Sequence, residues 1–257
     1  MRSGKKMKIT VPVSDLFIAH LERFSAFTEA VELKRVGIFV QGKYEFIFHS
    51  GQNLLDHALN CSFNEAFFDY LKENKVTYLS LDLGPACEKV EVVNKRYIAC
   101  SSIMNREKAF RVIERNLSYI KKYFTGRIAV ENLNYYRTGA YELVCDPAFI
   151  NEAVKRFGIK LLLDLAHAKI SAFNIKIDHA AYLDDLPLEE VIEVHLSQPS
   201  IAGDEMVDAH GWLEDRDFEE FKALLEHVQP EYVAIEHYRE LDKLIENYKK
   251  LKGLLNA

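Results

Sequence analysis

The sequence contains few of the residues that interrupt regular structure or cross-link a chain. Of its 257 residues, 11 are glycine and 6 are proline, which excludes collagen-like and low-complexity chains. The four cysteines form no Cys-x-x-Cys pair, so they match neither a zinc-finger motif nor an evident disulfide framework. We therefore expect a globular protein with reduced thiols.

Long apolar runs and an excess of positive charge are also missing. No segment approaches the roughly 18 consecutive apolar residues of a membrane span, and residues 1–7 carry no signal-peptide core. The formal net charge of -6 argues against bulk electrostatic attraction to nucleic acid. We expect a cytoplasmic protein without a membrane segment, for which nucleic acid is an unlikely partner.

The chain instead alternates short β-branched or aromatic runs with longer amphipathic stretches, a pattern typical of βα units on a parallel sheet. Eight strands are predicted, over residues 9–13, 31–35, 45–49, 77–82, 127–131, 160–164, 191–195 and 232–236. Helices are predicted over residues 15–27, 64–74, 105–124, 146–157, 217–227 and 240–255. The connections 36–44 and 172–186 look weak as helices. Eight strands in one chain of this length predict a (β/α)8 TIM barrel, formed as a single domain by residues 1–257.

Six successive predicted strands, the third to the eighth, end in a possible metal ligand. These residues are His49, Asp82, Glu131, Asp164, His195 and Glu236. In a barrel the C-terminal ends of the strands share one face, so the six side chains are expected to converge. His167 follows the sixth strand, and Asp208 and His210 follow the seventh at a spacing that turns both side chains to one side of an extended segment.

Four histidines, three aspartates and two glutamates thus make up the predicted site. A single polar residue at a strand end is usually a loop-capping hydrogen bonder, but so many ionisable groups buried together would be costly without cations. Carboxylates and neutral imidazoles are suitable ligands for transition metals. We therefore predict two or three metal ions, with open positions for water, oxygen or substrate.

Three segments carry a family resemblance: LLLDLAHAKISAFN at 161–174, YLDDLPLEEVIEVHL at 182–196 and DAHG at 208–211. They resemble the multinuclear non-haem iron-dependent oxidative enzymes (MNIO family), whose fold is a xylose isomerase-like barrel. The resemblance places metal ligands at the following positions: His49, Glu131, Asp164, His195, Asp208, His210 and Glu236. Asp82 and His167 complete the predicted set, with Asp82 at a strand end where the family usually has a histidine.

The resemblance implies iron, activation of oxygen, and oxidation of a peptide side chain or small thiol, often with a peptide-recognition partner. Glu131, Asp164 and Glu236 are the residues expected to take part in catalysis, with Glu131 bridging metal ions. Zinc or manganese stays open as the metal.

Three alternatives remain. The nine positions also suit the three-zinc site of an endonuclease IV-like phosphodiesterase, although residues 197–207 contain no Arg or Lys to hold a phosphate. A sugar isomerase or epimerase would need a single divalent metal on the following set: Glu131, Asp164, His195 and Glu236. A metal-binding barrel without enzymatic activity is the third alternative.

Overall fold

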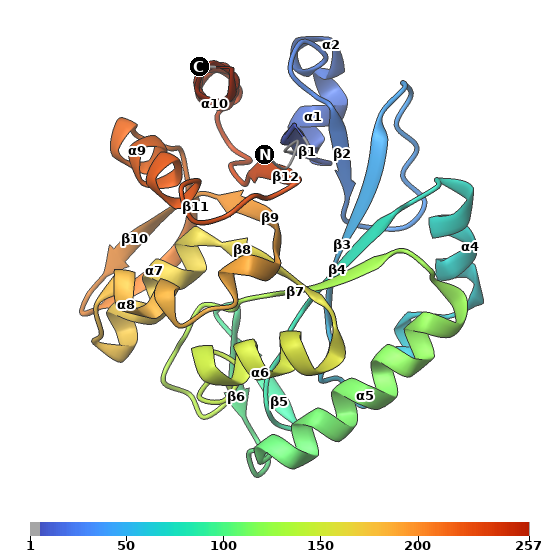
Figure 1. Ribbon diagram of the computed structural model, residues 1–257, viewed down its shortest axis with the longest axis vertical. Helices are drawn as coiled ribbons and strands as arrows, with labels where there is room; N and C mark the ends of the chain where they lie inside the picture. The colour runs from blue at the N-terminus through green and yellow to red at the C-terminus, as the bar shows by residue number, and fades with distance from the viewer. Residues whose placement is uncertain (1–5, 257) are drawn as a thin grey trace.

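Eight parallel strands close into a barrel in which the first strand pairs with the last (Figure 1). The structure is a computed structural model that describes residues 6–256. Part of the segment 1–7, in which we expect no signal peptide, therefore lies outside the described residues. Around the barrel the strands follow the order β1-β12-β9-β8-β7-β4-β3-β2. They are β1 (Lys8–Pro12), β2 (Ala30–Leu33), β3 (Glu45–Asn53), β4 (Tyr78–Asp82), β7 (Arg127–Glu131), β8 (Lys160–Asp164), β9 (Val191–Leu196) and β12 (Tyr232–Ile235). The predicted TIM barrel is confirmed.

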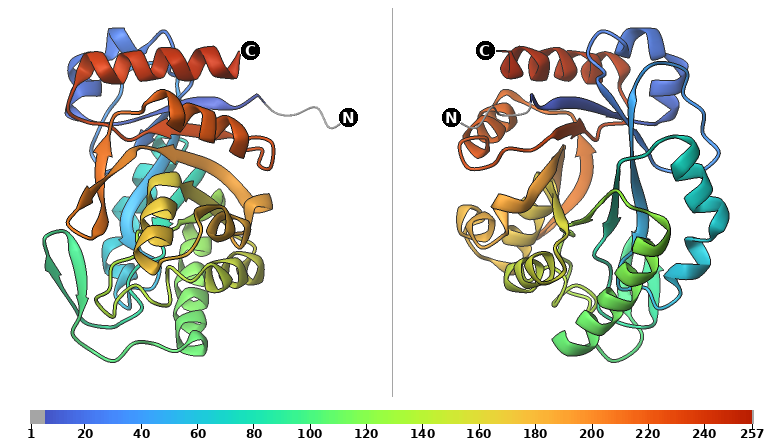
Figure 2. Two further views of the ribbon diagram at one scale, coloured as in Figure 1. Left: turned by 90° about the vertical axis from the view of Figure 1, so that its left-hand side faces the viewer. Right: turned by 45° about the vertical axis from the view of Figure 1, so that its right-hand side comes forward.

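Helices surround this barrel in Figures 1 and 2. They are α1 (Asp15–Ala19), α2 (Leu21–Phe24), α3 (Leu59–Ser62), α4 (Glu65–Glu73), α5 (Arg106–Tyr123), α6 (Pro147–Phe157), α7 (Leu165–Ile175), α8 (His179–Asp184), α9 (Asp215–Leu224) and α10 (Leu241–Leu255), with a 3-10 turn at Leu188–Glu190. Among residues 6–256, no helix has both the length and the apolar character needed to cross a membrane.

Local sequence signals explain where several helices begin and end. At the start of α6 the Asp146 carboxylate accepts a hydrogen bond from the N–H of Ala148, and Pro147 occupies the first turn. Gly158 ends the helix with a φ of 60°, in the left-handed region that glycine adopts without strain. Asn64 and Asn105 cap α4 and α5 in the same way, because each side chain accepts a hydrogen bond from a backbone N–H of the first turn.

The predictions for two connections had different outcomes. Residues 36–44 contain no helix, as expected. The prediction for 172–186 was wrong, because this stretch contains the end of α7 and all of α8. Consecutive residues of α7, such as Leu165 and Ala166, are buried, so the helix lacks the one-sided apolar stripe by which a surface helix is recognised.

The side chains that point into the barrel form an apolar layer below a polar one. The apolar layer consists of Ala30, Ile47, Tyr78, Ala129, Leu162, Ile192 and Tyr232. Because side chains alternate along a strand, the residues two positions further on face the same interior. In five of the strands these residues are Glu32, His49, Ser80, Glu131 and Asp164, all buried. The alternation of side chains along the strands thus places a layer of polar side chains next to the apolar layer, toward the C-terminal ends of the strands.

Two antiparallel hairpins, absent from the sequence prediction, extend from the C-terminal ends of barrel strands. The first, β5 (Val90–Val93) with β6 (Arg96–Ala99), follows β4, and the second, β10 (Gln198–Ala202) with β11 (Glu205–Gly211), follows β9. The left view of Figure 2 shows both projecting from the same side of the barrel. Arg96 joins them through an ion pair with Glu205 at 2.7 Å. The hairpins therefore form walls around the face where the predicted site lies.

Candidate metal centre

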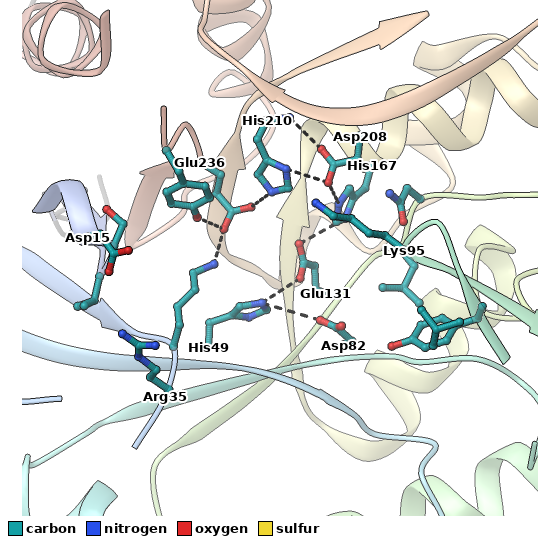
Figure 3. A pocket seen from close by; sticks show the side chains of 18 of the residues that line it. Asp15, Arg35, His49, Asp82, Lys95, Glu131, His167, Asp208, His210 and Glu236 are labelled. Carbon is teal, nitrogen blue, oxygen red and sulfur yellow. Dashed lines mark hydrogen bonds and ion pairs between the residues drawn. The ribbon is translucent and has the colours of Figure 1, made fainter. Parts of the chain in front are cut away.

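All nine predicted ligands gather at the C-terminal end of the barrel, in and beneath a cavity of about 840 Å³. Seven of them line the cavity: His49, Asp82, Glu131, His167, Asp208, His210 and Glu236. Figure 3 shows these seven side chains turned toward one another. Asp164 and His195 lie beneath the cavity surface, almost fully buried. The predicted convergence of the strand ends is thus found in the structure.

The first group of possible ligands consists of His49, Asp82 and Glu131, from β3, β4 and β7. One donor atom from each lies within 4.8 Å of the others. Nε2 of His49 lies 3.3 Å from Oε2 of Glu131 and 3.8 Å from Oδ1 of Asp82. Two carboxylates and one imidazole at these distances can share a metal ion.

The second group consists of Glu131, Asp164 and His195, whose donor atoms also lie within 4.8 Å of one another. Oε1 of Glu131 lies 3.9 Å from Nδ1 of His195, whereas its other oxygen faces His49. Asp164 also begins α7, because its Oδ1 accepts a hydrogen bond from the N–H of His167 at 2.7 Å. The two oxygens of Glu131 thus point to two different groups.

Strand β11 brings Asp208 and His210 to the opposite side of the cavity. Their side chains meet as the spacing predicts, with Nδ1 of His210 at 3.0 Å from Oδ2 of Asp208. Nε2 of His210 lies 3.4 Å from Oε2 of Glu236, and Nε2 of His167 lies 3.9 Å from Oδ2 of Asp208. Behind this pair, the Nδ1 of His237 is hydrogen-bonded to the carbonyl of His210 at 2.9 Å.

Hydrogen bonds to groups other than the nine predicted ligands fix one ring nitrogen of three of the histidines. Nδ1 of His49 bonds the Ser80 hydroxyl at 3.0 Å, and Nδ1 of His167 bonds the carbonyl of Asn132 at 2.9 Å. Nε2 of His195 bonds Glu32 at 2.9 Å. In each case the other nitrogen faces the carboxylates of the cluster, as metal-binding histidines require.

Glu32 and Lys34, on and just after β2, belong to the site but were missed by the sequence prediction. Glu32 forms a third group with His195 and Glu236, again with donor atoms within 4.8 Å. Nζ of Lys34 lies 3.0 Å from Oε1 of Glu32 and donates a hydrogen bond to Oε1 of Glu236. The signal was present in the sequence, because Glu32 and Lys34 are charged residues at alternate positions of a predicted strand.

The electrostatics of the acidic side of the cluster show crowded negative charge. Burial, together with the carboxylates of Asp82 and Asp164, raises the pKa of Glu131 well above its ordinary value. Burial also raises the pKa of Asp82 to about 6. A nearby cation would relieve this crowding and restore the ionised carboxylates.

The imidazoles respond to the same carboxylates. Burial lowers the pKa of His195, but Glu236 and Glu32 outweigh that effect and raise it well above its ordinary value. Asp208 and Glu236 likewise raise the pKa of His210 to about 10 against the effect of burial. These rings therefore hold protons that a metal ion would displace.

One buried atom tests whether the cluster suits a metal. Nδ1 of His195 is buried and forms no hydrogen bond within residues 6–256. It lies 3.6 Å from Oε1 of Glu236 and 3.9 Å from Oε1 of Glu131. An unsatisfied imidazole nitrogen that faces carboxylates is costly, and a cation bound by His195 and Glu131 would remove that cost. The residues fit a metal centre.

Solved enzyme structures share this fold. Endonuclease IV from Thermus thermophilus superposes with a TM-score of 0.62 at 15% identity, over 97% of this chain and 99% of that chain. A putative xylose isomerase from Rhodospirillum rubrum gives 0.62 at 13% identity, over 96% and 99% of the two chains. The 3-keto-D-glucoside 4-epimerase YcjR from E. coli gives 0.59 at 15% identity, over 98% and 100%. Such low identities show a shared fold, that of the xylose isomerase-like barrels.

Curated relatives match a smaller part of the chain. A UPF0276 protein from Vibrio parahaemolyticus is 32% identical over 108 residues, which are 40% of this chain and 38% of that protein. A UPF0276 protein from Caulobacter vibrioides is 29% identical over 104 residues, 40% of this chain and 37% of that protein. The matched stretch thus spans well under half the length of these relatives.

A family model for the RiPP precursor modification enzyme MbnB/TglH/ChrH matches residues 94–256. This range contains seven of the nine predicted ligands and excludes His49 and Asp82. The match confirms the family resemblance, and the fold and the clustered ligands agree with it. The chain belongs to the MbnB/TglH/ChrH family, whose model is described as that of a RiPP precursor modification enzyme.

Proposed function

We propose that this enzyme holds two or three iron ions and uses oxygen to oxidise a side chain of a peptide, or a small thiol. The observation that carries the proposal is the position of Glu131. Its Oε2 faces His49 at 3.3 Å and its Oε1 faces His195 at 3.9 Å, so one carboxylate is shared by two groups of ligands. A shared carboxylate is the arrangement expected for a bridge between two neighbouring ions. The membership in a family of peptide-modifying enzymes supports the substrate class.

In this proposal His49, Asp82 and Glu131 would hold one ion, and Glu131, Asp164 and His195 would hold a second. The remaining predicted ligands, His167, Asp208, His210 and Glu236, border the same cavity and would complete the coordination. Bound iron of this kind would supply electrons to oxygen and an open position for a substrate thiolate.

The chain itself would fix the geometry of the ligands and the approach of the substrate. Ser80, Asn132 and Glu32 hold the rings of three histidines in one orientation, so little rearrangement is needed when a metal binds. Arg35 and Lys95, both exposed, line the cavity and would attract an anionic group of the substrate. Because Asp164 and His195 lie beneath the cavity floor, water has little access to that side of the centre.

Arg96 would shape the wall against which a peptide docks. Its guanidinium lies 4.1 Å from the centre of the Tyr136 ring and pairs with Glu205, so the two hairpins are held together. The proposal includes a separate peptide-recognition partner that presents the substrate at this wall. Co-purification of the tagged enzyme with proteins encoded beside it tests this part directly.

Mössbauer spectroscopy of the protein reconstituted with ferrous iron under argon tests the proposed chemistry. We expect exposure to oxygen to convert part of the ferrous signal to ferric iron, and a thiol such as glutathione to change the spectrum. Asp164→Asn should weaken both responses, whereas the exposed control Asp204→Asn should leave them unchanged. An iron spectrum that does not respond to oxygen or thiol, with cleavage of abasic-site DNA instead, would favour the phosphodiesterase alternative.

A further inference from the structure

The side chain of Lys34 reaches from the end of β2 into the third group of possible ligands. Its Nζ contacts Oε1 of Glu236 and lies 3.0 Å from Oε1 of Glu32. The Glu32 side chain is fully buried and that of Glu236 is 6% exposed, whereas Lys34 remains 28% exposed because it also borders the cavity. The lysine therefore places one positive charge between two buried carboxylates.

The same two carboxylates, with His195, form a group whose donor atoms lie within 4.8 Å of one another. By its composition alone, two carboxylates and an imidazole, this group would suit a divalent cation. It differs from the other two groups because a cation is already in contact with it. Nζ of Lys34 contacts two of its three members.

Tyr238 helps to keep the ammonium group in this position. Its hydroxyl donates a hydrogen bond to Oε1 of Glu236 at 2.8 Å, the same oxygen that Lys34 contacts. The Tyr238 ring also lies 6.0 Å from Nζ of Lys34, within the range of a cation–π contact. The position of Lys34 is thus supported by an aromatic ring as well as by two carboxylates.

An ammonium group and a divalent ion cannot share this space. Two positive charges a few ångströms apart repel each other strongly in a poorly solvated site. The ammonium also uses the oxygen of Glu236 that an ion in this group would need, because that oxygen is the one facing Nδ1 of His195. The ammonium group of Lys34 therefore offsets negative charge of the two carboxylates and occupies the space that an ion would need.

We propose that the ammonium group of Lys34 takes the place of a metal ion at Glu32, His195 and Glu236, so that the enzyme binds two ions rather than three. The inference rests on the proposed metal centre, whose two remaining groups both contain Glu131. It assigns to Lys34 the role of a positioning residue that sets the number of metals without binding one.

Metal counting and anomalous diffraction test this inference together. Wild-type protein, Lys34→Met and the charge-retaining control Lys34→Arg are reconstituted with ferrous iron under argon, and iron per chain is measured. We expect two equivalents for the wild type and Lys34→Arg, and a third for Lys34→Met. Thermal melting of the metal-free proteins shows whether the variants are folded.

Crystals of iron-loaded wild-type protein give a reading that depends on no variant. The inference predicts anomalous peaks beside Glu131 and none among Glu32, His195 and Glu236. A peak at that third group in the wild type, or equal iron in wild type and Lys34→Met, would overturn the role of Lys34 but leave the proposed centre intact. Wild-type protein that binds no metal would overturn both.

Discussion

Nε2 of His195 and a carboxylate oxygen of Glu32 lie 2.9 Å apart, and both side chains are fully buried. Because of this bond, Nδ1 of the ring faces Glu131 and Glu236. Nδ1 has no hydrogen-bond partner in the described part of the chain. Glu32 does not line the cavity and is a member of neither of the first two groups of ligands, but it thus determines how His195 presents its other ring nitrogen.

Replacing Glu32 with glutamine tests that role. The variant loses the charge that supports the imidazole, so we expect metal affinity to fall about 10- to 100-fold. Competition with a fluorescent chelator measures the affinity, with Glu91→Gln on the exposed strand β5 as the matched control. Unchanged affinity in Glu32→Gln would show that the bond to His195 does not tune the site.

Glu131 and Asp82 should differ in how many ions they hold. Glu131→Gln removes a member of two groups, so we expect the protein to lose more than one metal ion. Asp82 belongs to one of these groups, and Asp82→Asn should therefore lose one ion at most. Elemental analysis of the purified variants measures the difference. If Glu131→Gln keeps its full metal content, the carboxylate is not a bridge.

The metal-free protein should show a pH-dependent contribution from His210. Asp208 and Glu236 raise the pKa of this residue to about 10, above its ordinary 6.5. A folded-state pKa above the unfolded value adds stability that is fully present below pH 6.5 and is lost as the pH rises through about 10. Urea unfolding of wild type and His210→Gln should therefore differ most at acidic pH. A difference that grows toward pH 10 would contradict this sign.

Asn247 tests how the second hairpin is anchored after β11. The Asn247 side chain is buried. It accepts a hydrogen bond from the N–H of Leu213 at 3.0 Å and donates one to the carbonyl of Leu213 at 2.9 Å. Asn247→Ala leaves both groups without partners, so we expect a loss of about 2–4 kcal/mol of stability. Chemical denaturation measures this loss, and Asn256→Ala at the exposed end of the chain is the control. A loss below about 0.5 kcal/mol would mean that water replaces the side chain.

From the sequence, the members of the site that lie at the ends of strands could be predicted. Residues such as Asp164 and Glu236 could be placed together because parallel strands in a barrel end on one face. Glu32 escaped prediction because it lies within a strand, at an inward position that apolar residues usually fill. Its partner His195 comes from a strand distant in sequence, and a single sequence does not show which strand lies across the barrel.

A weak local signal explains the part of the fold that was missed. The β5 and β6 strands are short, and their turn uses Asn94 and Lys95 with φ values of 49° and 63°, where glycine would have been the recognisable signal. The barrel itself could be predicted because its strands and most of its helices carry strong local patterns. The missed hairpin thus lacks a recognisable local signal, whereas the missed part of the site depends on contacts between segments far apart in the chain.

The metal content of protein purified without added metal tests the central claim most directly. Elemental analysis of wild-type protein from cells grown in ordinary medium needs neither a substrate nor a variant. We predict iron as the principal metal, at two equivalents per chain. Stoichiometric zinc without iron would contradict an oxygen-using iron centre and would favour hydrolytic chemistry on the same ligands.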